Sequence, residues 1–452
     1  MAPAVKIDIS DLIDTSRIAS LQVGIFILCS VCLFTVGFDW QALGYVAPAV
    51  VQDFRIPNAA LGPVFGAANV GFLIGAVAVS MLADKIGRRP VLIGATVFFA
   101  VVALFTAGAT SLSELAVLRF MSGIGFGSVI PTATALVGEY SPQRKRITAI
   151  MVMTTLGMNG GAVIGGFVSA WWIPMFGWRS VFYAGGVVPL FIAVLMFFRL
   201  PESMQFLVLH NRKPEDVADG IKRIDPDAAA GGAVEYVVHE DNSRGVPLGH
   251  LFREGRAMAT TLLWILNFMN LLIVHLVSSW LPTVIREAGY SISTAVLVAT
   301  VLQIGGMIGT FVLAWLIGRR GLVPVLAASL ALTCGAVALI GQPGLSLAAL
   351  TAAVFVAGWC VIGSQLGINA LAAIFYPTSL RSSGVGWGLG VGRAGAIVGP
   401  VIGGELMRLQ WPTNQIFLAA AMPAAISTAA MFSMRWAVKG DVRAMMGANH
   451  RL

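Results

Sequence analysis

The chain has 452 residues, of which 57% are hydrophobic and only 11% are charged. Soluble domains carry roughly 25% charged residues, so this composition excludes a soluble protein and indicates one that crosses a membrane many times. The net charge of +8 would suit nucleic-acid binding, unless the basic residues are distributed as they are around membrane spans.

Twelve apolar stretches are long enough to span a bilayer, since a spanning helix needs about 20 apolar residues. Six lie in the first half of the chain, at 21–46, 59–83, 91–110, 114–138, 147–170 and 180–198. Six lie in the second half, at 257–283, 293–316, 323–341, 347–374, 382–406 and 414–434. We therefore expect an all-α membrane protein with a tail (1–20), a six-helix bundle (21–198), a polar connector with two short helices (199–256), a second six-helix bundle (257–434) and a second tail (435–452).

The basic residues predict the orientation of these spans. If the N-terminus is cytoplasmic, the inside segments hold 23 of the 29 Lys and Arg residues and the outside loops hold four. The remaining two, Arg119 and Arg393, lie within spans. Cytoplasmic loops of membrane proteins carry such an excess. We expect both termini on the cytoplasmic side of the cell inner membrane, contact with lipid, and no partnership with nucleic acid.

The two halves of the chain repeat each other. Lys85-Ile86-Gly87-Arg88-Arg89 follows the second span, and Ile317-Gly318-Arg319-Arg320 follows the eighth. Similar pairs of motifs follow the fourth and tenth spans, at offsets of about 231 to 238 residues. Two six-span repeats predict a transporter whose binding site lies near the midplane between them. A channel would need a pore-lining ring or a filter signature, and the sequence shows neither.

Asp39 is the only acid that lies well inside a predicted span. An ionised carboxylate in hydrocarbon costs several kcal/mol, so such a residue marks a functional site or takes up a proton. At a rise of 1.5 Å per residue, Asp39 and Arg119 lie roughly 10 Å and 8 Å from the outer ends of their spans, so we expect them at one depth. We interpret them as a proton-coupling pair whose contact depends on the protonation of Asp39. The alternative is a static salt bridge that fixes packing.

Acidic and basic residues also gather at the cytoplasmic ends of the spans. Asp84 and Arg88 follow the second span, Glu139 ends the fourth, and Arg381 precedes the eleventh. We interpret these four residues as a cytoplasmic gate that favours the state open to the outside, with Asp84 near the start of another helix, such as the eleventh. Simple anchoring by positive charge is the alternative, but it does not account for the acids.

Arg393 lies near the middle of the eleventh span, among glycines that allow a close approach. Its planar guanidinium suits a carboxylate, so we predict that it binds an anionic substrate; the alternative is a structural role between helices. Polar and aromatic side chains at compatible depth complete the predicted substrate site: Gln365, Asn369, Gln303, Asn159, Trp387 and Phe38. Taken singly, each amide is better explained by packing between helices, and each aromatic by packing in the core or against lipid; it is the cluster with Arg393 that favours a polar pocket. His275 in the seventh span is a minor candidate.

These motifs resemble those of the major facilitator superfamily. The segment Ala83-Asp84-Lys85-Ile86-Gly87-Arg88-Arg89 is similar to the cytoplasmic loop motif of the superfamily, and Leu115-x-x-x-Arg119-x-x-x-Gly123 is similar to its fourth-helix motif. Gly37-Phe38-Asp39 and the run from Tyr376 to Arg393 resemble the aromatic acid:proton symporter family within it. The resemblance covers nearly the whole chain and implies the major facilitator fold and an aromatic substrate.

Two positions depart from that family pattern. The family usually has an acid three residues before the matching aspartate, where this chain has Val36. The second-half loop, 315–320, has no acid where the first half has Asp84. The first departure affects how many protons are carried with each substrate. The second removes an acid from one of the two expected cytoplasmic gates and so weakens that gate.

The sequence thus predicts a proton-coupled transporter that imports a small aromatic carboxylate of the benzoate or hydroxybenzoate type, working as a monomer. The alternatives are efflux or antiport of an amphipathic compound, or a sensor that keeps a transporter fold without transporting. No nucleotide-binding loop and no nucleophile constellation supports an enzyme, and we expect no cofactor and no metal.

Overall fold

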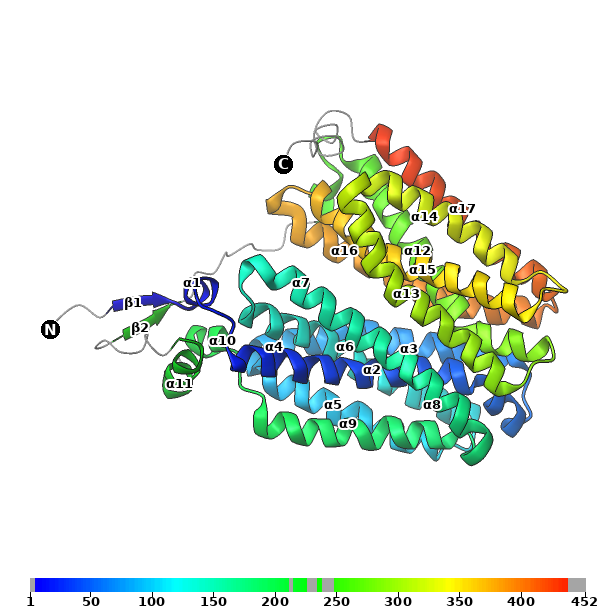
Figure 1. Cartoon of the computed structure of the whole chain (residues 1–452), viewed down its shortest axis with the longest axis horizontal. Coiled ribbons are helices and arrows are strands. Elements are labelled where there is room, and N and C mark those ends of the chain that lie inside the picture. Colours follow the sequence, from blue (N-terminus) through cyan, green and yellow to red (C-terminus); the bar gives the residue numbers. More distant parts are fainter. Residues whose placement is uncertain (1–4, 211–213, 226–233, 238–247, 438–452) are drawn as a thin grey trace.

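The computed structural model describes residues 5–210, 214–225, 234–237 and 248–437. Within these ranges, twelve helices are long and apolar enough to cross a membrane, which confirms the predicted number of spans. They form two bundles that lie against each other, one from each half of the chain (Figure 1). The chain is a multi-pass membrane protein.

The first bundle holds six spans, two of which are interrupted by π-helical turns. Its elements are α2 (Ser20–Phe54); a second span made of η1 (Asn58–Leu61), α3 (Gly62–Ile74), η2 (Gly75–Val79) and α4 (Ser80–Ile86); α5 (Arg88–Ala107); α6 (Leu112–Tyr140); a fifth span made of α7 (Gln143–Thr154), η3 (Thr155–Asn159) and α8 (Gly160–Phe176); and α9 (Arg179–Arg199). The second bundle is built from α12 (Ala257–Glu287), α13 (Ile292–Arg320), α14 (Leu322–Ile340), α15 (Leu347–Phe375), α16 (Thr378–Arg408) and α17 (Thr413–Ala437).

Some span ends differ from the sequence prediction. The first span was predicted to end at residue 46, but α2 continues to Phe54. Pro48 lies inside this helix and does not end it, because neighbouring groups in a membrane bundle satisfy the backbone that a proline frees. The fifth span likewise continues to Phe176 rather than residue 170. Asp39 therefore lies 15 residues from the end of its helix, near the middle of α2, and not close to the outer end.

The connector packs together with the N-terminal tail at one end of the first bundle. It holds the two short helices that we predicted, α10 (Met204–Leu209) and α11 (Pro214–Ile224), and a 3-10 turn, η4 (Leu248–Phe252). Strand β1 (Val5–Asp8), which precedes the short helix α1 (Ile9–Thr15), pairs in parallel with β2 (Val234–Val237). We did not predict these strands. We call this end of the molecule the connector side, and the opposite end the loop side (Figure 1).

The two bundles share one apolar core on the loop side and have separate cores on the connector side. The loop-side cluster joins buried residues of both bundles, such as Val46 of α2 and Leu276 of α12. Toward the connector side, Leu33 and Phe126 belong to a cluster of the first bundle, and Leu326 belongs to a cluster of the second. The ribbons of the two bundles diverge in the same direction (Figure 1).

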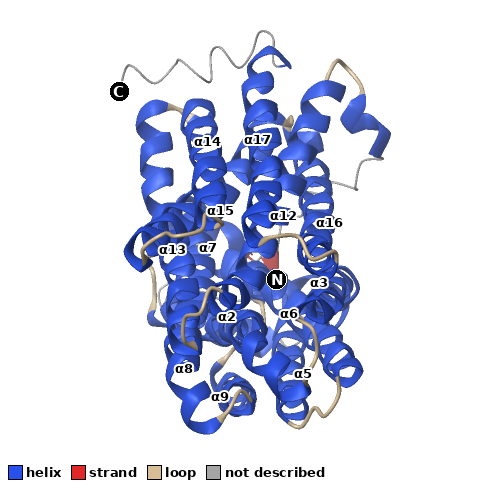
Figure 2. Ribbon diagram, turned by 90° about the vertical axis from the view of Figure 1, so that its right-hand side faces the viewer, coloured by secondary structure: helices blue, strands red, loops and turns tan. Residues whose placement is uncertain are grey.

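Close backbone contacts and hydrogen bonds hold the loop side together. Gly62 of the second span faces Gly404 of α16 so closely that a Cβ on Gly404 would lie 3.0 Å from the Cα of Gly62. The hydroxyl of Ser293 donates to the carbonyl of Ala170 at 2.9 Å, and Asn58 donates to Glu287. Figure 2 looks onto this side, where α2, α3 and α8 lie beneath α12, α16 and α13. The protein is closed on its loop side.

Candidate functional site

Asp39 of α2 and Arg119 of α6 form an ion pair in the interior of the first bundle. Arg119 Nη1 lies 3.3 Å from Asp39 Oδ1, and Nη2 lies 3.5 Å from Oδ2. The side chains are 0% and 2% exposed. Burial removes both charges from water at a cost in free energy, which their mutual attraction and additional hydrogen bonds must offset. The expectation that they meet agrees with this contact, although the helix ends used to estimate their depth were misplaced.

Other groups surround the guanidinium of Arg119. Its Nη2 also donates to Ser122 Oγ at 2.9 Å and to Thr106 Oγ1 at 3.4 Å, and its Cζ lies 4.7 Å from the ring centre of Phe182. Gly185 of α9 leaves room for the carboxylate, since a Cβ there would lie 3.4 Å from Asp39 Oδ1. Arg119 Nε is buried and has no hydrogen-bond partner in the described part of the chain. Arg119 therefore keeps its contacts with Ser122, Thr106 and Phe182 when Asp39 changes its charge.

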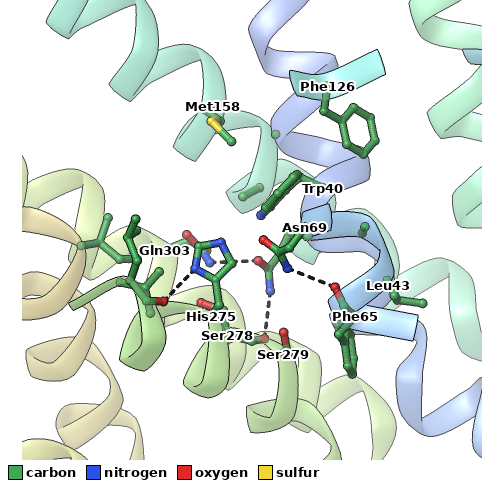
Figure 3. A pocket seen from close by; sticks show the side chains of 18 of the residues that line it. Trp40, Leu43, Phe65, Asn69, Phe126, Met158, His275, Ser278, Ser279 and Gln303 are labelled. Carbon is green, nitrogen blue, oxygen red and sulfur yellow. Dashed lines mark hydrogen bonds between the residues drawn. The ribbon is translucent and has the colours of Figure 1, made fainter. Parts of the chain in front are cut away.

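A cavity of about 230 Å³ lies between the two bundles. Both bundles line it, and Arg119 and Arg393 contribute to its wall. Its polar lining residues besides the two arginines are Gln41, Asn69, Asn159, His275, Ser278, Ser279, Gln303 and Gln365. Its aromatic wall is formed by Trp40, Phe65 and Phe126 (Figure 3). Pockets for drug-sized ligands span about 300–1,000 Å³, so this one suits a smaller molecule.

Arg393 has no acidic partner within the described part of the chain. Its Cζ lies 3.9 Å from the ring centre of Phe72, on α3 of the other bundle. A cation over an aromatic face is stabilised, but its hydrogen-bond donors remain available. Arg393 is thus a cation in a partly apolar cavity with no carboxylate of the protein beside it. This arrangement is suited to an anionic ligand.

Gln365 is held in place by three asparagines. Its Oε1 accepts from Asn270 Nδ2 at 2.8 Å, and its Nε2 donates to Asn267 Oδ1 at 3.1 Å and to Asn369 Oδ1 at 3.2 Å. Asn369 does not line the cavity, and its described role is to orient Gln365. The structure therefore favours a positioning role for Asn369, through its hydrogen bond to Gln365, over direct contact with a ligand.

Gln303 and Gln41 connect the two bundles at the cavity. Gln303 Nε2 donates to Gln41 Oε1 at 3.2 Å, and Gln41 Nε2 donates to the carbonyl of Ser278 at 3.1 Å (Figure 3). Asn159 lies at the end of the π-helical turn η3 and also reaches the cavity. Such turns recur at functional sites, because the extra residue redirects the side chains that follow.

Two predicted substrate residues lie away from the cavity. Phe38 packs against Gly165 of α8, where a Cβ on that glycine would lie 3.1 Å from its ring. Trp387 is 47% exposed and stacks on Trp264, with ring centres 6.3 Å apart. Trp387 lies six positions before Arg393, which amounts to about 9 Å along the helix and places the two on different faces. The structure does not bring Phe38 or Trp387 to this site.

Our site prediction omitted several lining residues. Gln41 is a polar residue inside an apolar span, so a signal for it was present beside Asp39. Asn69 and Trp40 were recognised at compatible depth but left out, because packing between helices was the likelier explanation for each taken singly. Phe72, which carries Arg393 on its ring without lining the cavity, gave no signal in the sequence. His275, a minor candidate, does line the cavity. Among the described residues, no group of His, Cys, Asp or Glu is placed to hold a metal ion.

Three of the four predicted gate residues, Asp84, Arg88 and Glu139, cluster within the first bundle. Arg88 Nη2 lies 3.2 Å from Asp84 Oδ1 and 3.1 Å from Glu139 Oε1. Glu202 accepts from the backbone N–H groups of Arg88 and Arg89 at 2.9 and 3.1 Å, at the start of α5. The side chain of Asp84 is 71% exposed and has no described contact with α16.

The other half of the predicted gate is not engaged. Arg381, at the start of α16, is exposed and has no described ion pair. The described gate residues therefore pair within one bundle, and no contact of theirs bridges the two bundles. Since the connector side holds separate apolar cores, the expected contact between Asp84 and the start of the eleventh helix has no opportunity to form in this conformation.

Comparison with known proteins identifies the relatives of this chain. The profile described as Major Facilitator Superfamily matches residues 29–387 and 263–443. The 4-hydroxybenzoate transporter PcaK of Pseudomonas aeruginosa is 38% identical over 432 residues, which cover 95% of this chain and 96% of that protein. The gallate transporter of Pseudomonas putida is 39% identical, with coverage of 92% and 93%. Among solved structures, a D-xylose–proton symporter superimposes with a TM-score of 0.71 at 16% identity, covering 92% of this chain and 97% of that one.

Proposed function

Because the chain belongs to the Major Facilitator Superfamily, and within it to the aromatic acid:proton symporter family, we propose that it imports a small aromatic carboxylate together with protons. The named relatives are transporters of 4-hydroxybenzoate and gallate, and no enzyme is among them. The substrate is a ring-bearing carboxylate of that kind, and the protein works as a monomer in the inner membrane, with both termini in the cytoplasm.

The observation that carries the proposal is Arg393 in the cavity between the bundles. Its guanidinium has no acidic partner in the described residues, and it lies on the ring of Phe72. A carboxylate accepts two parallel hydrogen bonds from a guanidinium, and an aromatic ring fits a wall made by Trp40, Phe65 and Phe126. Gln303, which keeps one N–H beyond its bond to Gln41, and Asn159 supply further hydrogen bonds to the bound anion, whereas Gln365, whose two N–H donors go to Asn267 and Asn369, shapes the wall of the cavity.

The proton is carried by Asp39. In the described conformation its carboxylate is paired with Arg119, and Arg119 in turn lines the cavity. Protonation of Asp39 weakens this pair, because a neutral acid no longer compensates the guanidinium. The guanidinium of Arg119, which has lost its counter-charge, is then attracted to an anion in the cavity. Proton and substrate thereby bind to neighbouring and interdependent positions.

Transport proceeds by alternating access. The loop side, which we place outside the cell, is closed by contacts such as Gly62 with Gly404, and the connector side has separate cores. The opposite state closes the connector side, where Asp84, Arg88, Glu139 and Arg381 are available to join the bundles. Rocking of two bundles around a central site is the general mode of such repeats.

The test is a panel of radiolabelled acids offered to cells that express the protein. We expect uptake of 4-hydroxybenzoate or a close relative, accelerated by an outside pH below the inside pH and abolished by a protonophore. Cells that carry the empty vector give the background. Loss of preloaded substrate in place of uptake would show efflux or antiport, and no movement of any acid by correctly inserted protein would show a sensor; either result overturns the proposal.

A further inference from the structure

His275 presents a hydrogen-bond acceptor to the cavity. Its Nδ1 lies 2.9 Å from the carbonyl oxygen of Leu271. A carbonyl can only accept, so Nδ1 carries the proton, and Nε2 of the neutral ring is an acceptor. No donor to Nε2 is found among the described residues, although the side chain is only 9% exposed and lines the cavity.

A second acceptor faces the same space. Asn69 donates through Nδ2 to the carbonyl of Phe65 at 3.0 Å, while its Oδ1 is buried and has no partner in the described part of the chain. Figure 3 shows Asn69 and His275 below Trp40, with the amide oxygen of Asn69 turned toward the space between them. Buried polar atoms are nearly always hydrogen-bonded, so the unfilled Oδ1 of Asn69, with the acceptor Nε2 of His275 lining the same cavity, indicates a missing donor.

Trp40 links these acceptors to the carboxylate site. Its ring lies edge-to-face on His275, with centres 5.9 Å apart, and edge-to-face on Phe72, with centres 5.2 Å apart. Phe72 is the ring on which Arg393 sits. Trp40 therefore contacts both His275 and the ring that carries Arg393, so a substrate ring that lies along Trp40 has the cation and the acceptors in one cavity.

We propose that His275 and Asn69 accept hydrogen bonds from a hydroxyl group on the substrate ring and thereby select hydroxylated aromatic carboxylates over benzoate. This inference rests on the proposed function of the same cavity. A site built to hydrogen-bond a hydroxyl rejects the analogue that lacks it, because its buried polar groups are then left unpaired. Residues that only packed the helices would not distinguish the two ligands.

The test is calorimetric binding to the purified full-length protein, with benzoate, 3-hydroxybenzoate, 4-hydroxybenzoate and 4-methoxybenzoate as probes. We expect one hydroxybenzoate to bind at least about tenfold more tightly than benzoate. The methoxy compound has no donor and should bind no better than benzoate. This comparison needs no substitution and therefore does not depend on the folding of a variant.

Two substitutions locate the discrimination. His275→Phe and Asn69→Leu should each weaken hydroxybenzoate binding roughly tenfold more than they weaken benzoate binding. His275→Gln, which keeps an acceptor, should retain part of the preference for the hydroxylated ligand. A structural role would weaken all probes alike, so the ratio between ligands is the decisive quantity.

The possible failures are distinguishable. Equal affinity of the wild-type protein for benzoate and both hydroxybenzoates would overturn the selection of hydroxyl groups and leave the proposed function intact. An equal loss for every ligand in both His275→Phe and Asn69→Leu would likewise remove these residues from that role. If folded wild-type protein bound no aromatic carboxylate at all, the proposed function would fail together with this inference.

Discussion

At the scale of single residues, the site depends on two arginines in different circumstances. Arg119 is 2% exposed and pairs with Asp39, whereas Arg393 lines the cavity over the ring of Phe72 and has no acidic partner among the described residues. The first guanidinium has its counter-charge within the protein, and the second lacks one. In the proposed mechanism, the substrate carboxylate and the transported proton therefore have separate principal partners.

Arg393→Lys tests the carboxylate site. Lysine keeps the positive charge but loses the planar pair of donors, so substrate should bind roughly tenfold more weakly or worse. The measurement is calorimetry with 4-hydroxybenzoate on purified protein. Arg408→Lys, which alters an exposed arginine on the same helix, is the control and should bind like wild type. Unchanged affinity in Arg393→Lys would remove this residue from the site.

The charged residues of the site could be predicted from the sequence, and many of its neutral residues could not. Asp39, Arg119 and Arg393 stand out because charges inside apolar spans are rare and expensive. Asn69 and Trp40 do not, since amides and aromatic rings are ordinary in membrane helices. Whether such a residue faces a cavity or a neighbouring helix depends on rotation and on the second bundle, which local sequence does not encode.

At the scale of elements, the close approach of α2 to the fifth span shapes the cavity. A Cβ on Gly37 would lie 1.9 Å from the carbonyl oxygen of Met158, so only glycine permits this contact. Met158 and Asn159 belong to the π-helical turn η3, and both line the cavity. Glycine at position 37 thus lets the backbone of η3 reach the site.

Gly37→Ala should disturb the protein, whereas Gly24→Ala on the same helix should not. The added methyl group at residue 37 forces the backbones apart, and overpacking of this kind costs about 1–3 kcal/mol. A Cβ on Gly24 meets no atom within 4 Å. Thermal unfolding of the purified variants in detergent should show a lower midpoint for Gly37→Ala alone. Equal midpoints would mean that the contact with Met158 carries no strain.

The number of elements was predictable, and their irregular parts were not. Apolar length predicts each span, because lipid requires about 20 residues to be covered. The continuation of α2 past Pro48 and the π-helical turns depend on neighbours that satisfy the backbone. Strands β1 and β2 pair residues more than 200 positions apart, so neither four-residue segment signals a strand by itself.

At the scale of the whole molecule, the two bundles are joined on one side only. The sequence holds the residues that close the loop side and those that we expect to close the connector side. It does not indicate which of these two conformations a structure will show. The described state is closed on the loop side and leaves Asp84 exposed on the connector side. We therefore expect the gate residues to act in the state that is not described.

Asp84→Asn tests that role. The substitution removes a charge that should contact the start of α16 when the connector side closes, so the closed connector-side state should be less populated. Single cysteines placed on the connector-side faces of α6 and α16 should then react faster with a thiol reagent. Lys85→Gln, a change at the adjacent exposed residue, is the control. Labelling at the wild-type rate in Asp84→Asn would contradict the gate.

The proton number is also a property of the whole molecule. Asp39 is the only acid well inside a span, and Val36 occupies the position where the family usually has a second acid. One proton with one monoanion moves no net charge, so substrate addition should give no sustained current on a solid-supported membrane. A second proton would move one net charge per cycle, which is worth about 2.3 kcal/mol through 100 mV and would appear as a current. A steady current would show that a second proton is carried.

The central claim is that Asp39 couples substrate accumulation to the pH gradient, and accumulation in vesicles tests it most directly. Purified wild-type protein and Asp39→Asn are reconstituted, a pH gradient is imposed, and labelled 4-hydroxybenzoate is followed. One pH unit corresponds to about 1.36 kcal/mol, so wild type should concentrate substrate up to roughly tenfold per unit. Asp39→Asn should exchange substrate with preloaded vesicles, which shows that it is folded, but should not concentrate it. If Asp39→Asn vesicles concentrate the substrate as wild type does, Asp39 does not carry the proton and the account is wrong.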